Sequence, residues 1–284
     1  NASVPELNHD GIINIKKGRH PLIDEKKVVP TDIYLGKDFD TLVITGPNTG
    51  GKTVTLKTIG LLTLMAQSGL QIPALETSTV GLFDEVLVDM GDEQSIEQSL
   101  STFSAHMTNI VKILSELTPD SLVLFDELGA GTDPVEGAAL AISVIEAVRR
   151  AGALCASTTH YAELKAFAID TDGVCNASCE FDIETLRPTY RLIVGTPGRS
   201  NAFAISEKLG MPSDVIKRAD ELIERDNKRF EDVIEKLDTN RMEMEKERDR
   251  AETLRREYEE FKRKSLNNDG EVIAFPRTHL EFLL

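Results

Sequence analysis

The sequence contains few cysteines, with three among its 284 residues. An odd number of thiols cannot pair completely within one chain, which argues against a disulfide framework and fits a reducing cytosol. Cys175 and Cys179 are four positions apart, but no histidine or second cysteine pair completes the spacing of a metal site. We therefore expect Cys155, Cys175 and Cys179 to be core thiols near strands of a cytoplasmic protein.

Long apolar runs are also missing, and the longest are far too short to cross a bilayer. The first residues lack the basic stretch followed by an apolar core that marks a secretory leader. The chain begins with Asn1 rather than methionine, so we expect it to be a segment of a longer polypeptide. No membrane partner is expected.

Basic residues are in the minority, with 32 Lys and Arg against 48 Asp and Glu and a net charge of −16. A domain whose main task is to grip a nucleic-acid backbone usually carries a basic face. This segment is therefore not expected to form the principal DNA-binding surface alone, although local basic clusters could still contact phosphate.

A complete phosphate-binding loop, G-x-x-x-x-G-K-[ST], is present between an apolar β-branched run, Thr41–Thr45, and a helical pattern. Glycines allow backbone N–H groups to surround phosphate oxygens, and the helix N-terminus adds the positive end of its dipole. Lysine reaches the β- and γ-phosphates of ATP, and the following hydroxyl binds Mg²⁺. The expected cofactor-binding residues are Gly46, Pro47, Asn48, Thr49, Gly50, Gly51, Lys52 and Thr53.

Strand-like and helical patterns alternate through the middle of the chain, which predicts an α/β fold with crossover helices. An entry segment covers residues 1–37 and the core covers 38–201. Expected strands are Phe83–Val88, Ser121–Phe125 and Leu154–Thr158, with a late hairpin of Ser178–Ile183 and Tyr190–Val194; expected helices are Phe103–Leu117 and Val135–Arg150.

The sequence pattern changes after the core. Residues 202–216 read as a helix-turn-helix, with Gly210 and Pro212 in the turn. One long charged helical pattern then runs from Asp214 to about Lys264, so that residues 217–266 form a helical linker. Its apolar seam is interrupted by arginines, which leaves a solvated helix and a coiled coil equally open. Residues 267–284 form a tail of uncertain structure.

Two adjacent carboxylates end the apolar run Leu122–Phe125. Ligands gather at the carboxyl ends of strands in a parallel sheet. Asp126 is therefore expected to meet the Mg²⁺ held by Thr53, and Glu127 to orient and polarise the attacking water. His160 follows the next core strand and is expected to sense the γ-phosphate and hold that water. Lys52, Glu127 and His160 are the candidate catalytic residues.

Hydroxyl residues open the helix expected at Phe103–Leu117. Such residues commonly cap a helix, but a helix N-terminus also binds anions. If Ser101 met the γ-phosphate of ATP bound to a second copy, hydrolysis would require a dimer. Both interpretations stay open on periodicity alone.

Together these stretches resemble the ATPase core of the bacterial MutS family, and specifically its second, recombination-suppressing subfamily, over about residues 18–266. The mismatch-repair branch typically has Met where Thr49 stands and a different run after the acidic pair. The matching stretches are Gly46–Thr53, Ser101–Phe103, Asp126–Gly137, Thr158–Lys165 and Gly195–Phe203.

The resemblance implies an ABC-type P-loop NTPase, with a mixed sheet flanked by helices, that forms a head-to-tail homodimer with composite ATP sites. It favours Ser101 as a contact in trans, adds Asn48 to the phosphate shell and places Arg19-His20-Pro21 near the nucleotide. Residues 202–216 resemble the family's dimer-stabilising element. The long helix resembles a linker to a C-terminal nuclease domain that this segment lacks.

Four functions follow as hypotheses. The leading one is an ATPase that couples its nucleotide state to binding of branched or recombining DNA and suppresses homologous recombination. Members of this subfamily are also implicated in rescuing collided ribosomes, so rRNA is an alternative target. The nucleotide-binding domain of an ABC transporter is less favoured, because the helix start reads Ser-Leu-Ser-Thr-Phe. A module that only clamps ATP is disfavoured by the acidic pair, Asp126 and Glu127.

Overall fold

A computed structural model describes residues 2–47, 50–91, 102–182, 184–198, 201–222 and 225–267. The chain divides into two compact units, residues 1–234 and 235–284, and each is described by itself. Within the described residues, no helix is both long enough and apolar enough to cross a membrane.

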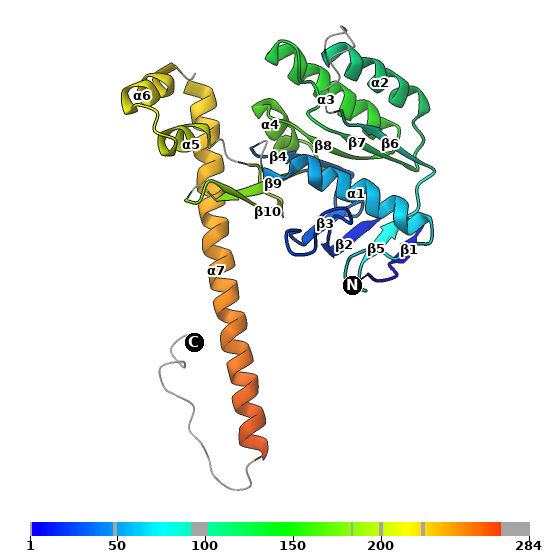
Figure 1. Ribbon diagram of the computed structural model, residues 1–284, viewed down its shortest axis with the longest axis vertical. Helices are drawn as coiled ribbons and strands as arrows, with labels where there is room; N and C mark the ends of the chain where they lie inside the picture. Colours follow the sequence, from blue (N-terminus) through cyan, green and yellow to red (C-terminus); the bar gives the residue numbers. More distant parts are fainter. Residues whose placement is uncertain are drawn as a thin grey trace. The chain divides into compact units, whose positions relative to one another are not determined.

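The first unit is built around a six-stranded sheet of order β10-β9-β4-β8-β7-β6 (Figure 1). Neighbouring strands from β9 to β6 run parallel, and β10 is antiparallel to β9. The central strands are buried on both faces, as parallel strands covered by helices must be. The strands are β4 (Thr41–Thr45), β6 (Glu85–Asp89), β7 (Ser121–Phe125), β8 (Leu154–Thr158), β9 (Val174–Asp182) and β10 (Arg187–Val194).

Helix α1 (Lys52–Gln67) covers one face of this sheet and carries a second, four-stranded sheet on its other side (Figure 1). Leu56, Ile59 and Leu62 of α1 join a cluster with residues of both sheets. Burial on two sides explains why the helix is apolar over most of its surface. The small sheet has the order β1-β5-β2-β3, from β1 (Glu6–Asn8), β2 (Ile13–Gly18), β3 (Thr31–Leu35) and β5 (Thr79–Gly81).

The opposite face of the large sheet is covered by three helices, α2 (Thr102–Glu116), α3 (Pro134–Arg150) and α4 (Ala162–Asp170). Because side chains alternate along a strand, Leu42 and Ile44 face α1, whereas Val43 faces this second cluster. Helix α3 begins at an Asp133 cap, whose carboxylate accepts N–H bonds from Val135 and Glu136.

The expected mixed α/β architecture with helices flanking the sheet is confirmed. Strands Ser121–Phe125 and Leu154–Thr158 lie where expected, and the late hairpin is longer than expected, formed by β9 and β10. Strands β1 and β5 and helix α4 were not anticipated, because three-residue strands and a nine-residue helix leave little periodicity to detect.

The structure describes the expected helix from Asp214 to about Lys264 in two stretches, α6 (Ser213–Leu222) and α7 (Arg225–Asn267), and residues 223 and 224 between them lie outside the described residues. A single continuous helix therefore stays a prediction. Helix α5 (Ala202–Lys208) precedes both, and Gly210, at φ 92°, follows α5 in the left-handed conformation that ends helices. The domain boundaries proposed from the sequence stay predictions.

Within the second unit, α7 is strongly charged, and ion pairs such as Arg255–Glu259 lie along its surface. Two apolar residues of α7, Met244 and Tyr258, are exposed, at 73% and 48%. Pairing of α7 with another helix stays a prediction.

A close approach of two glycines fixes the loop that follows β7 against α3. Gly129 adopts φ 83°, and a Cβ added at Gly137 would lie closer than 3.0 Å to the Gly129 carbonyl oxygen and to the Tyr161 hydroxyl. Tyr161 in turn donates a 2.8 Å hydrogen bond to the Gly129 carbonyl. Any side chain at residue 137 would push on backbone next to the acidic pair.

Gly137→Ala is therefore expected to destabilise the chain. Alanine gains about 1 kcal/mol of helix propensity over glycine, but overpacking against backbone costs about 1–3 kcal/mol. Urea unfolding should show a net loss, while Ser143→Ala on the exposed face of α3 should show none. Equal or greater stability of Gly137→Ala would contradict the close contact.

Candidate active site

Three neighbouring parallel strands deliver the candidate residues to one edge of the large sheet. The register pairs Ile44 of β4 with Thr158 of β8, and Phe125 of β7 with Ser157 of β8. Gly46 and Asp126, directly after β4 and β7, and His160, two residues after β8, therefore lie around the same point.

The phosphate loop follows β4, and α1 begins at its lysine. Gly46 has φ 132° and Gly51 has φ 95°, conformations that favour glycine. A Cβ at Gly46 would press on the Cys179 carbonyl, and one at Gly51 would lie 2.7 Å from the Tyr190 ring. The glycines are thus required by packing as well as by the turn. Asn48 and Thr49 lie outside the described residues, so their phosphate contacts stay predictions.

Lys52 is 2% exposed and held within the loop. Its ammonium donates to the Gly46 carbonyl at 2.8 Å and lies 3.0 Å from His160 Nε2. Since an ammonium can only donate, Nε2 is the acceptor and the neutral ring carries its proton on Nδ1. Burial lowers the pKa of Lys52, partly offset by the nearby Glu127 carboxylate. Burial and the Lys52 charge lower the pKa of His160.

A chain of hydrogen bonds joins Thr53 to the acidic pair. The Thr53 hydroxyl donates to Asp126 Oδ2 at 2.7 Å, and the Thr158 hydroxyl donates to Asp126 Oδ1 at 2.6 Å. The Glu127 N–H donates to Thr158 Oγ1 at 2.8 Å. Both carboxylate oxygens of Asp126 are therefore oriented before any ligand arrives.

Glu127 lies at a sharp backbone turn after β7, and its side chain approaches His160. Its φ is 50°, a conformation that non-glycine residues rarely adopt. Its Oε1 lies 3.7 Å from His160 Nε2, and both side chains are nearly half exposed. Glu127 and His160 thus stand together at the open side of the site, where a water molecule could reach them.

The oxygen atoms of Thr53 and Asp126 fit a hard cation such as Mg²⁺. Within the described ranges, no group of three or more His, Cys, Asp or Glu side chains could hold a metal ion. Mg²⁺ commonly binds through one or two protein ligands together with water and substrate phosphate, and this pair fits that pattern. Of the three cysteines, Cys155 and Cys179 are buried and Cys175 is half-buried.

A pocket of about 320 Å³ adjoins the phosphate loop at Gly51. Tyr190, which the sequence analysis missed, lines it from β10. Tyr190 has φ 58° at an irregularity of the β9–β10 pairing, and its carbonyl accepts a bond from Thr31. The remaining lining residues are Gly18, His20, Ile23, Lys27, Val28, Val29, Thr31, Val54, Thr55 and Thr58.

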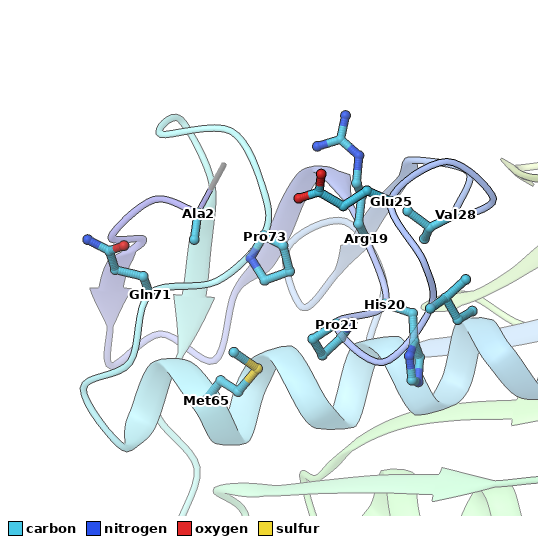
Figure 2. A pocket seen from close by; sticks show the side chains of 10 residues that line it. Ala2, Arg19, His20, Pro21, Glu25, Val28, Met65, Gln71 and Pro73 are labelled. Atoms are coloured by element: carbon cyan, nitrogen blue, oxygen red, sulfur yellow. The ribbon is translucent and has the colours of Figure 1, made fainter.

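The 19–28 segment also lines a larger cavity of about 530 Å³ (Figure 2). Met65 enters it from α1, while Arg19 and Glu25 lie at the side away from the helix. Of the Arg19-His20-Pro21 stretch expected near the nucleotide, only His20 also lines the pocket beside Gly51. Burial and the charge of Lys57 lower the pKa of His20.

Helix α2 begins at Thr102, and Ser101 lies outside the described residues, so its contact in trans stays a prediction. The start of α2 packs on the loop after the acidic pair, because a Cβ at Gly131 would lie 3.3 Å from Phe103. Asp89, at the end of β6, anchors the same helix through His106 Nδ1 at 2.8 Å and Asn109 Nδ2 at 2.9 Å.

Comparison with known proteins places this geometry in a family. The family model described as MutS domain V matches residues 42–226, which include the loop, the acidic pair and His160.

Curated relatives extend the match over nearly the whole chain. Endonuclease MutS2 of Clostridium acetobutylicum is 61% identical over 264 residues, covering 93% of this chain and 34% of that protein. Endonuclease MutS2 of Clostridioides difficile is 62% identical over 258 residues, covering 91% of this chain and 33% of that protein. The chain thus spans about a third of the length of these relatives. It belongs to the MutS family, in the branch of the proteins named endonuclease MutS2.

Proposed function

We propose that the chain is the Mg²⁺-dependent ATP hydrolase of a MutS-type protein. The observation that carries the proposal is the hydrogen-bonded series from Thr53 through Asp126 and Thr158 to Glu127, placed beside the buried Lys52 of a phosphate loop. Such a site holds triphosphate, metal and water in the order that phosphoryl transfer needs.

Each residue has a distinct task in this proposal. The loop amides and the start of α1 hold the phosphates, and Lys52 moves from Gly46 and His160 to the β- and γ-oxygens. Thr53 and Asp126 hold Mg²⁺, which neutralises developing charge on the phosphates. Glu127 orients the attacking water and draws off its proton, and His160 contacts the γ-phosphate and that water.

The base and ribose are proposed to occupy the pocket beside Gly51. Its aliphatic side chains Ile23, Val28 and Val29 and the ring of Tyr190 provide apolar surface for a planar base. The unusual backbone of Tyr190 supports a role there, since conformations of this kind gather at ligand sites.

The site is proposed to be completed by a second copy in a head-to-tail homodimer, with Ser101 as the contact in trans. The packing of α2 on Gly131 supports this, because the helix that starts beside Ser101 is fixed to the loop after Glu127. Helix α6 and the turn between α5 and α6 present exposed apolar side chains, Val215 on the helix and Leu209 and Met211 in the turn, which suit the proposed dimer-stabilising role.

The target of the whole protein is proposed to be branched or recombining DNA, with the ribosome as the alternative. The relatives are named endonucleases, and we assign nuclease activity to parts of such a protein that lie outside this segment. Membership of the MutS family disfavours the transporter alternative, which co-purification of a membrane subunit would revive.

Lys52→Ala is expected to lower ATP turnover by at least about 100-fold, because a buried positive charge at the phosphates is lost. Phosphate release at saturating ATP and Mg²⁺ measures this, with the exposed Lys112→Ala as the control. Turnover equal to that of the parent chain would refute the phosphate-loop assignment.

Glu127→Gln is expected to bind ATP normally, to hydrolyse it about 100-fold or more slowly, and to favour a dimer with ATP bound. The amide keeps the size of the side chain but cannot accept the proton of water. Sizing chromatography with ATP and Mg²⁺ tests the dimer, with Glu136→Gln as the control. A monomer under these conditions would count against the composite site.

ATPase assays of the whole protein with branched DNA, linear DNA and ribosomes separate the two targets. Branched DNA is expected to stimulate turnover most, because the proposed coupling links nucleotide state to DNA binding. Stimulation by ribosomes alone would favour the alternative.

A further inference from the structure

Thr158 is the last residue of β8. It belongs to the hydrogen-bonded series described above, but the proposed mechanism gives its hydroxyl group no task of its own. Its side chain is 0% exposed and lies between the strands that carry the phosphate loop and the acidic pair. Thr158 therefore contacts the catalytic residues from the interior of the protein, where it cannot touch substrate.

The Thr158 hydroxyl group makes two hydrogen bonds of fixed direction. The Glu127 N–H can only donate, so Thr158 Oγ1 accepts that bond, at 2.8 Å. The hydroxyl proton is then left for Asp126 Oδ1, at 2.6 Å. One small group thus joins the side chain of the proposed metal ligand to the backbone of the proposed water-orienting residue.

The bond from the Glu127 N–H holds an unfavourable backbone conformation. Glu127 has φ 50°, in the left-handed region, where the Cβ of a non-glycine residue lies too close to its own carbonyl oxygen. The next peptide is held by the same residue, because the Leu128 N–H donates to the Thr158 carbonyl at 3.1 Å. The direction in which the Glu127 side chain leaves the backbone therefore depends on Thr158 from two sides.

Thr158 also links these acids to the other strand ends. The next residue, Thr159, donates its N–H to the carbonyl of Ile44 near the end of β4, and His160 follows directly. The end of β8 thus fixes the positions of Glu127 and His160 relative to the phosphate loop.

We infer that Thr158 is a positioning residue for ATP hydrolysis, whose hydroxyl group sets the Asp126 carboxylate and the Glu127 backbone at the spacing that the reaction requires. This inference rests on the proposed ATPase activity. It predicts that the hydroxyl governs turnover and Mg²⁺ dependence while contributing little to nucleotide affinity, because Thr158 lies behind the loop.

The test compares Thr158→Val, which keeps the shape and removes the hydroxyl, with Thr158→Ser, which keeps the hydroxyl. Loss of a partner behind a metal ligand typically costs about 10–100-fold, so kcat of Thr158→Val should fall by that factor. Its half-saturating Mg²⁺ concentration should rise, and its dissociation constant for a fluorescent ATP analogue should stay within about threefold. Thr158→Ser should recover most of kcat.

Thr63→Val is the matched control. Thr63 is also 0% exposed, and its hydroxyl has no hydrogen-bond partner within the part of the chain that the structure describes. This variant should keep the kcat and Mg²⁺ dependence of the parent. If Thr158→Val does not fold, Thr158→Ser against Thr158→Ala gives the same comparison, since both lack the methyl group and they differ in the hydroxyl.

Two results would overturn the inference. One is a folded Thr158→Val with the kcat of the parent, and the other is a loss of nucleotide affinity that accounts for the whole fall in activity. Failure of the proposed function looks different, because the parent chain and Thr63→Val would then both lack ATP turnover.

Discussion

The parallel register of β4, β8 and β7 is the constraint on which the site depends. Pairing Ile44 with Thr158, and Phe125 with Ser157, brings three chain turns to one edge of the sheet. A shift of one residue in β4 or β7 would turn every side chain of that strand to the other face and separate Thr53 from Asp126. The apolar clusters on both faces hold this register, since Val43 and Ile44 pack into different cores.

Polar groups at this edge are satisfied by one another. Lys52 bonds to Gly46 and His160, Asp126 accepts two hydroxyl bonds, and Thr158 bridges to Glu127. Burial of charged and polar groups costs free energy unless they are paired, so these bonds fix the rotamers of the site. An arrangement prepared in this way needs little reorganisation when charge develops on a substrate.

Local features of this fold were predictable from the sequence, and contacts between distant segments were not. The phosphate loop, the acidic pair and strands Ser121–Phe125 and Leu154–Thr158 each carry their own signal of glycines, charges or apolar runs. Tyr190 could not be found this way, because its position depends on an irregular β9–β10 pairing. The sequence predicts Thr158 only as a strand residue. Its contact with Asp126 depends on the register of β7 and β8.

The Lys52 ammonium is paired within the protein, by contacts to the Gly46 carbonyl and the His160 imidazole. An incoming anion must compete with the Gly46 carbonyl and the imidazole for the ammonium protons. Its observed affinity is then the difference between two sets of hydrogen bonds, which is smaller than the strength of the new set. A neutral molecule would form weaker hydrogen bonds with the ammonium than an anion would. The pairing of Lys52 with Gly46 and His160 therefore favours highly charged ligands.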